Sequence, residues 1–201
     1  MDIIQAEEAY IQLGADPKLS PIIEKWGKCK LKRGENYFFE LCRSIMAQQI
    51  STKVAQKLQQ RMEELFDGDV SAEKVLKTPV EELQSIGISR RKTETIHAIA
   101  SLCQGDSLLF HQIDEMTDQE VSAYLTRIKG VGAWTVTMFL IFALNRPRVI
   151  PSGDFGIRKA LQNLFGLQNL PSPQQVEELY RVWAPHESAA SWYLWRSLEN
   201  D

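Results

Sequence analysis

The sequence predicts an all-α fold, a two-lobed arrangement of about ten helices, for three reasons. Apolar residues recur every three or four positions along most of the chain, which is the period of a helix with one buried face. Several stretches begin with Ser or Thr followed three residues later by Glu or Gln, a pattern typical of helix starts. Strand signals are weak, because the best candidate, residues 148–151, is short and ends in proline. We therefore expect residues 1–201 to form a single helical unit of two lobes.

The individual helices follow from apolar spacing and from helix-start residues. Four amphipathic helices are expected from spacing: residues 37–46, 54–66, 176–183 and 189–198. Thr78, followed by Pro79, predicts another helix start with Thr78 as the N-cap. Capping boxes at residues 117–120 and 172–175 predict two further starts.

Composition excludes some classes of protein. A net charge of −3 argues against a protein that coats nucleic acid nonspecifically, although a local patch could still bind DNA. No apolar run approaches the roughly 20 residues of a membrane span, and the N-terminus carries acids where a signal peptide carries bases. We expect no membrane partner and a cytoplasmic (nucleoid) or nuclear location.

Cysteines and histidines give no metal or cofactor signal. The three cysteines are scattered, and we interpret Cys42 and Cys103 as structural thiols. The histidines, which are His97, His111 and His186, do not have metal-ligand spacing. Neither a zinc site nor an iron–sulfur cluster is expected.

The most informative segment, residues 118–144, predicts two helices joined by a glycine turn. Gly130, Val131 and Gly132 interrupt the helical pattern, and the glycines let the backbone turn tightly and approach a ligand. Backbone N–H groups at the start of the second helix favour an anion such as a DNA phosphate, and Lys129 adds positive charge. Taken alone, the segment is equally compatible with an ordinary tight turn that ends a helix with glycine.

Asp154 lies where another helix begins, since apolar residues at helical spacing follow it. By itself, an aspartate at this position is interpreted as an N-cap, and Ser152 competes for that role.

Together, these features resemble the helix-hairpin-helix DNA glycosylase superfamily, over residues 37–198. Four segments carry the resemblance in the family's order: residues 45–51, 128–136, 149–158 and 183–195. The resemblance implies that Asp154 is the catalytic carboxylate. A fixed carboxylate would stabilise the positive charge that develops on the sugar and would orient or deprotonate a water.

Residues that differ from those of some superfamily members indicate which branch of the superfamily this chain resembles. Bifunctional relatives carry a lysine where this chain has Trp134, and iron–sulfur relatives carry four C-terminal cysteines that are absent here. What remains resembles the 3-methyladenine DNA glycosylase II branch, in a compact form without the N-terminal β-rich lobe of some members. The implied reaction is hydrolysis of alkylated purines flipped out of duplex DNA, which leaves an abasic site. We expect a monomer that requires no cofactor.

The resemblance also assigns roles to the remaining site residues. Trp134, Met138 and His186 would line the base pocket, with the indole face of Trp134 attracting a cationic base. His186 is equally compatible with a surface helix start, and it stands where relatives have an aromatic residue, followed by Glu187 where they have arginine.

Contacts to DNA are expected from two further segments. Gln49 would fill the gap left by the flipped base, or else satisfy backbone groups together with Gln48. Arg90 or Lys92, after a second glycine turn, could touch a phosphate or form a solvated face.

In relatives the hairpin carbonyls can hold Na⁺ or K⁺, which here would be those of Thr126, Ile128 and Val131. Two alternatives stay open at this point. One is a helix-hairpin-helix DNA-binding protein without catalysis, and the other is a glycosylase for other damaged bases.

Overall fold

The structure, a computed structural model, describes residues 3–105 and 112–199. Twelve α-helices and one 3₁₀ helix occur in these residues, and no strand does. The all-α prediction is therefore confirmed. His111 lies outside the described residues. None of the described helices combines the length and the apolarity that a membrane crossing requires.

The chain divides into two compact units, one of which contains both ends of the sequence. The first unit comprises Met1–Arg33 and Leu140–Asp201, and the second comprises Gly34–Phe139. The chain passes from the second unit back into the first within helix α10.

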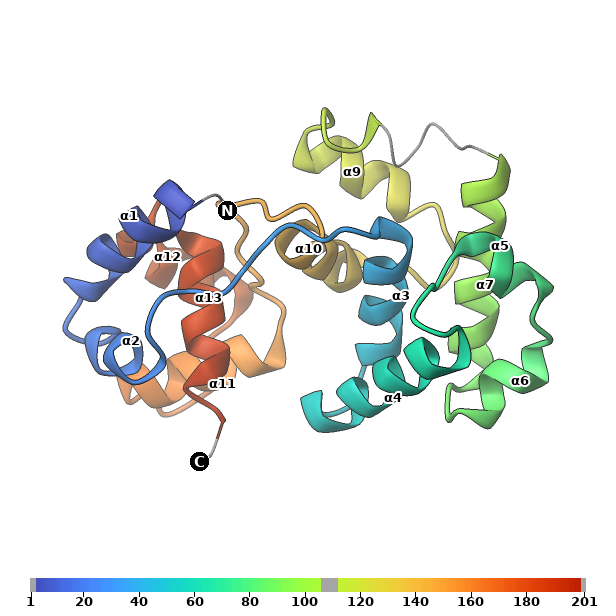
Figure 1. The fold of residues 1–201 in the computed structure, drawn as a ribbon. Coiled ribbons are helices and arrows are strands. Elements are labelled where there is room, and N and C mark those ends of the chain that lie inside the picture. Colours follow the sequence, from blue (N-terminus) through green and yellow to red (C-terminus); the bar gives the residue numbers. More distant parts are fainter. Residues whose placement is uncertain (1–2, 106–111, 200–201) are drawn as a thin grey trace. The chain divides into compact units, whose positions relative to one another are not determined.

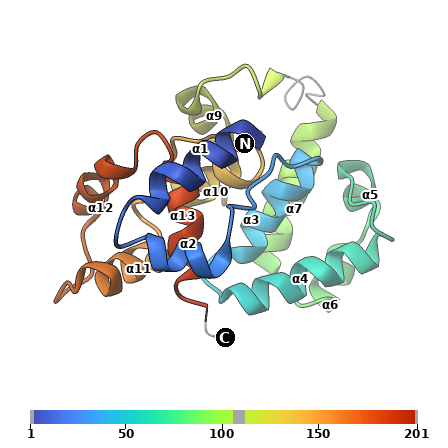
Figure 2. The ribbon, with the colours of Figure 1, turned by 60° about the vertical axis from the view of Figure 1, so that its left-hand side comes forward.

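The first unit is built around its last helix. Its elements are α1 (Ile3–Gly14), α2 (Ser20–Trp26), α11 (Phe155–Phe165), α12 (Pro173–Tyr180), η1 (Arg181–Trp183) and α13 (Glu187–Arg196). Helices α1, α2 and α11 all contact α13 (Figures 1 and 2).

Polar groups on buried aromatic side chains join the two ends of the chain within this unit. The Trp183 indole N–H donates to Asp16 Oδ2 at 2.8 Å, and the Tyr193 hydroxyl donates to the Gly27 carbonyl at 2.9 Å. Both side chains are almost fully buried, so each polar group needs such a partner. These bonds fix the N-terminal helices against the C-terminal ones.

The second unit packs helices around α7. Its elements are α3 (Tyr37–Ala47), α4 (Thr52–Leu65), α5 (Ala72–Lys77), α6 (Val80–Ser85), α7 (Arg90–Gly105), α9 (Asp118–Leu125) and most of α10 (Ala133–Phe142). Helices α3, α5 and α6 each contact α7.

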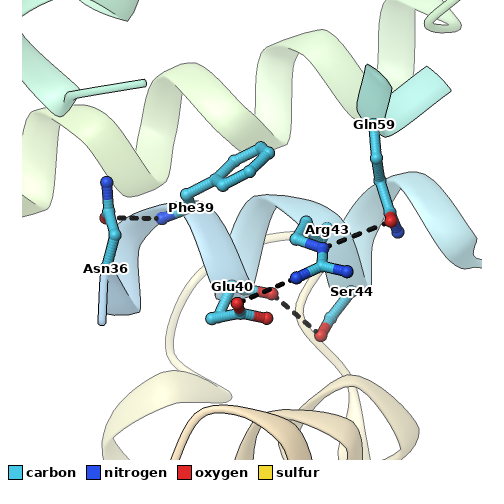
Figure 3. A network of polar contacts seen from close by, with 6 residues as sticks. All are labelled: Asn36, Phe39, Glu40, Arg43, Ser44 and Gln59. Carbon is cyan, nitrogen blue, oxygen red and sulfur yellow. Dashed lines mark hydrogen bonds and ion pairs between the residues drawn. The ribbon is translucent and has the colours of Figure 1, made fainter. Parts of the chain in front are cut away.

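Helix α3 is fixed at its start and along its exposed side (Figure 3). The Asn36 side chain caps it by accepting from the Phe39 N–H at 3.0 Å. The Arg43 guanidinium binds Glu40 Oε1 at 2.9 Å on the same helix and Gln59 Oε1 at 3.2 Å on α4. Arg43 therefore links α3 to α4.

Two of the three predicted helix starts are confirmed and one is wrong. Thr117 and Ser172 both form complete capping boxes. Thr78 does not cap α6, because Pro79 holds the N-cap position. The Thr78 hydroxyl instead donates to the Lys74 carbonyl at 2.9 Å, at the end of α5. The Thr78 hydroxyl thus bonds to the end of α5 and does not cap the start of α6.

The cysteines behave as structural thiols, as predicted. Cys42 is fully buried and all three are free. Burial raises the pKa of the Cys42 thiol well above its usual range and that of Cys103 to about 12. A thiol that stays protonated at neutral pH is a poor nucleophile and a poor metal ligand.

Candidate active site

Asp154 is the N-cap of α11, and its carboxylate is also held by a second helix. Oδ1 accepts the Ile157 backbone N–H at 2.9 Å and the Trp195 indole N–H from α13 at 2.9 Å. The predicted cap is therefore confirmed. Ser152 does not compete for it, since its hydroxyl donates to Glu177 Oε1 at 3.2 Å. The side chain is half-buried at a helix N-terminus, where a negative charge is favoured.

Trp195 contacts Asp154, although the sequence places it only within the amphipathic helix expected over residues 189–198. It is half-buried. Its indole N–H lies on a helix whose other large side chains are almost fully buried. An indole N–H in such surroundings needs a hydrogen-bond acceptor. This need is the only feature of the sequence that points to a polar partner for Trp195. The sequence could not show that the acceptor is Asp154.

The hairpin places its two glycines in different roles. Gly130 has φ +95°, and a Cβ there would lie 2.2 Å from Thr95 Oγ1 on α7, so only glycine fits. Gly132, directly before α10, has ordinary φ and open space where a Cβ would be. Gly130 thus serves the fold, whereas nothing in the fold requires glycine at position 132.

Residues around Gly132 leave the start of α10 accessible. Lys129, Gly130 and Gly132 are exposed, while Val131 is buried and its N–H closes the turn onto the Ile128 carbonyl at 3.0 Å. A glycine before the first helical residue offers no side chain that could cap the helix. The first amides of α10 can therefore approach an anion.

The loop between α3 and α4 is held by side chains so that Gln49 projects. Gln48 Nε2 donates to the Gly130 carbonyl at 3.0 Å and to Thr135 Oγ1 at 2.8 Å, which confirms its predicted structural role. Gln49 is exposed and has φ +56°, an uncommon conformation for a residue other than glycine. The Gln48 bonds link this loop directly to the hairpin.

Lys92 is half-buried, and its ammonium group is bound to backbone carbonyls. Its Nζ donates to the carbonyls of Met46 and Gln48, both at 2.8 Å, and so holds the end of α3 and the start of the loop. Desolvation, and secondarily the charge of Arg91, lowers the pKa of Lys92. The side chain of Arg90 is 81% exposed and pairs with Glu94 at 3.0 Å.

The three expected pocket residues belong to different units. Trp134 is half-buried and Met138, one turn later on α10, is buried, both in the second unit. His186 is the N-cap residue of α13 in the first unit. It is only 6% exposed, so the interpretation as a surface helix-start histidine is wrong.

The described residues contain no cluster of three or more His, Cys, Asp or Glu side chains suited to a metal ion. Of the carbonyls considered for a monovalent cation, that of Ile128 accepts the Val131 N–H. A carbonyl oxygen has two lone pairs, so this bond leaves it able to coordinate an ion.

Comparisons with known proteins identify the family to which the chain belongs. The model of the HhH-GPD superfamily of base excision DNA repair proteins matches residues 42–186. DNA-3-methyladenine glycosylase 1 of Schizosaccharomyces pombe is 31% identical over 212 residues, covering 98% of this chain and 92% of the relative.

Solved structures show the same fold. A 3-methyladenine DNA glycosylase from S. pombe, in complex with abasic DNA, matches with a TM-score of 0.86 and 29% identity, over 94% of this chain and 96% of that one. A 3-methyladenine DNA glycosylase from Archaeoglobus fulgidus matches with a TM-score of 0.82 and 30% identity, over 94% and 68% of the two chains. The predicted superfamily and branch are confirmed, and the chain belongs to the HhH-GPD superfamily of base excision DNA repair proteins.

Proposed function

We propose that this protein is a monofunctional DNA glycosylase that removes alkylated purines from duplex DNA and leaves an abasic site. The observation that carries the proposal is the Asp154 carboxylate, held at the start of α11 by two hydrogen bonds. Relatives named DNA-3-methyladenine glycosylase support the substrate class. The abasic DNA bound to the S. pombe protein is the product type that this reaction would leave.

Asp154 would act on the sugar rather than on the base. Breaking the N-glycosidic bond develops positive charge on the sugar, and a fixed carboxylate stabilises this charge more than the neutral ground state. The same carboxylate can orient the attacking water and take its proton. A purine methylated at N3 or N7 is already cationic and leaves as a neutral base, so this leaving group needs little acid catalysis.

Trp134 supports the proposal that there is no lyase step. A lyase of this superfamily would need a lysine amine at this position to attack the sugar, and an indole cannot do so. With an indole at this position, water would be the nucleophile that attacks the sugar.

DNA would be held at two linked points of the second unit. The first amides of α10, beside Gly132, and the charge of Lys129 would bind a phosphate. Gln49 would enter the duplex where the damaged base has left it. Because Gln48 ties the Gln49 loop to the hairpin, the phosphate contact would fix the position of the wedge along the strand. Arg90, exposed at the start of α7, would add a further contact to the backbone.

A monovalent cation on the carbonyls of Thr126, Ile128 and Val131 would strengthen the phosphate contact by adding positive charge there. The residues fit such an ion because carbonyl oxygens are hard neutral donors. Equal DNA affinity in potassium chloride and in choline chloride would argue against the cation.

We further propose that the protein acts as a monomer, in a nucleoid or a nucleus, wherever its DNA lies.

The direct test is base release from defined DNA. We expect the protein to release methylated purines from methylated duplex DNA, and ethenoadenine from an oligonucleotide, with chromatography of the free bases as the measurement. The strand should stay intact until alkali cleaves it at the abasic site, and borohydride should trap no covalent complex. DNA binding without base release would instead indicate a non-catalytic DNA-binding protein, and release of oxidised or deaminated bases alone would indicate a different lesion class.

The pocket role of Trp134 makes a separate prediction. Trp134→Ala should slow release of cationic 7-methylguanine by about tenfold, since a desolvated cation–π contact contributes about 1–2 kcal/mol. Release of the largely neutral ethenoadenine should fall less. Trp134→Phe, which keeps a smaller aromatic face, is the matched control, and single-turnover rates are the measurement. Equal losses for the two lesions would contradict a cation–π role. In this pocket, Met138 and His186 would border the base.

A further inference from the structure

We propose that Trp195 is a positioning residue that fixes the Asp154 carboxylate for the reaction. This inference rests on the proposed function, because it assigns Trp195 a part in the chemistry of Asp154. It starts from an N–H···O bond of 2.9 Å between Trp195 Nε1 and Asp154 Oδ1.

The bond adds a restraint that an ordinary helix cap lacks. The Ile157 N–H restrains Oδ1 from the first turn of α11 only. The indole N–H reaches the same oxygen from a different helix, also at 2.9 Å. Two donors from α11 and α13 therefore hold this oxygen more firmly than the helix cap alone would.

The indole is itself held in place. Its ring packs on Phe142, with centroids 5.5 Å apart and planes inclined by 30°. Phe142 is the last residue of α10, so the end of α10 supports one face of the ring. The N–H direction thus depends on packing rather than on a freely rotating side chain.

Gly156 provides the space in which the two side chains meet. A Cβ at this position would lie 3.1 Å from Asp154 Oδ1 and 3.2 Å from Trp195 Cδ1. Both distances are tighter than most real Cβ contacts. Gly156 has no left-handed φ, so its backbone conformation does not require glycine. A Cβ there would instead require the indole or the carboxylate to shift by a few tenths of an ångström.

The same face of α13 also holds the segment that leads to Asp154. Ser188 lies seven residues before Trp195, or about two turns away on one face. Its Oγ donates to the Arg146 carbonyl at 2.6 Å and accepts the Val149 N–H at 3.2 Å, and its N–H donates to the Pro147 carbonyl at 3.0 Å. Helix α13 therefore binds the segment 146–154 at two points, near its start through Ser188 and at Asp154 through Trp195.

Trp195→Phe tests the role because it removes the N–H and keeps an aromatic ring beside Phe142. We expect the single-turnover rate of base release to fall about tenfold, the scale of one charge-assisted hydrogen bond. Affinity for abasic DNA should stay within about twofold of wild type, since Trp195 is assigned no DNA contact. Gly156→Ala should reduce the rate in the same way by pushing the indole and the carboxylate apart.

Trp192→Phe is the matched control. Trp192 lies on the same helix and is almost fully buried, and its ring packs against Tyr193 and under Arg196. Its replacement removes an indole N–H from the same helix at a site that is more buried than that of Trp195, and it should leave the rate unchanged. A Trp195→Phe rate equal to that of Trp192→Phe would overturn the positioning role.

A stability measurement separates this inference from the proposed function. A double-mutant cycle combines Trp195→Phe with Asp154→Ala. The melting temperature of the double variant should fall by less than the sum of the decreases in the two single variants. Additive losses would overturn the contact itself. A wild-type protein that releases no damaged base would overturn the proposed function, and the stability cycle would still report on the contact.

Discussion

Asp154→Asn is expected to abolish most base release while leaving the fold intact. Asparagine keeps an Oδ1 that can accept the Ile157 and Trp195 N–H groups and is as good an N-cap as aspartate. It lacks the charge that would stabilise the cationic sugar and the basicity that would take a proton from water. Losing one fixed electrostatic group typically costs a hundredfold or more, so we expect a fall of at least about 10²-fold in the single-turnover rate.

Asp154→Ala separates the two roles of this side chain. It removes both the charge and the cap, so it should lose activity and also about 1 kcal/mol of unfolding free energy. Thermal melts, binding to abasic DNA and excision rates measured on both variants make the comparison. If Asp154→Asn turned over at the wild-type rate, Asp154 would be a structural cap only, and the catalytic assignment would be wrong.

Gly130→Ala is expected to be the most destabilising single change in the hairpin. The new Cβ would meet Thr95 Oγ1 at 2.2 Å, and alanine at φ +95° is strained besides. Backbone strain and overpacking each cost about 1–3 kcal/mol, so we expect a loss of roughly 2–5 kcal/mol in unfolding free energy by chemical denaturation. Adding Thr95→Ala should recover the loss of unfolding free energy that comes from the steric clash. The loss that comes from backbone strain should remain.

Gly132→Ala is the matched comparison two residues away. A Cβ there meets no atom within 4 Å, and φ is not left-handed, so stability should hold or rise slightly. DNA affinity should fall about tenfold, because the methyl group would occupy the space through which a phosphate approaches the start of α10. If Gly132→Ala bound DNA as tightly as the wild type, the phosphate contact would not lie at this glycine.

Much of this fold could be predicted because its signals are local. The capping boxes at Thr117 and Ser172 join residues three positions apart. The Asp154 cap reaches only to Ile157. Helical periodicity extends over a few turns, so a single stretch of sequence contains it. Where two local signals competed, as at Thr78, the sequence could not decide which helix would take the hydroxyl.

The site could be predicted only in part. Periodicity places Trp195 in an amphipathic helix, and the basic residues after a glycine turn offer Lys92 for a phosphate contact or a solvated face. In the structure, Trp195 binds a carboxylate 41 positions away, and Lys92 binds carbonyls 44 and 46 positions away. Both side chains carry donors that need acceptors, but nothing in their local sequence identifies a distant partner.

The sequence by itself thus determined the helices, the glycine turn and an aspartate at a helix start. Each of these depends on interactions within a few residues of chain. Tertiary structure alone decided that Gly130 must be glycine for Thr95, whereas Gly132 is left open. It also decided that Asp154 is held by α13 as well as by its own helix. Contacts between helices distant in sequence depend on how the whole chain buries its apolar faces, and no local pattern contains that information.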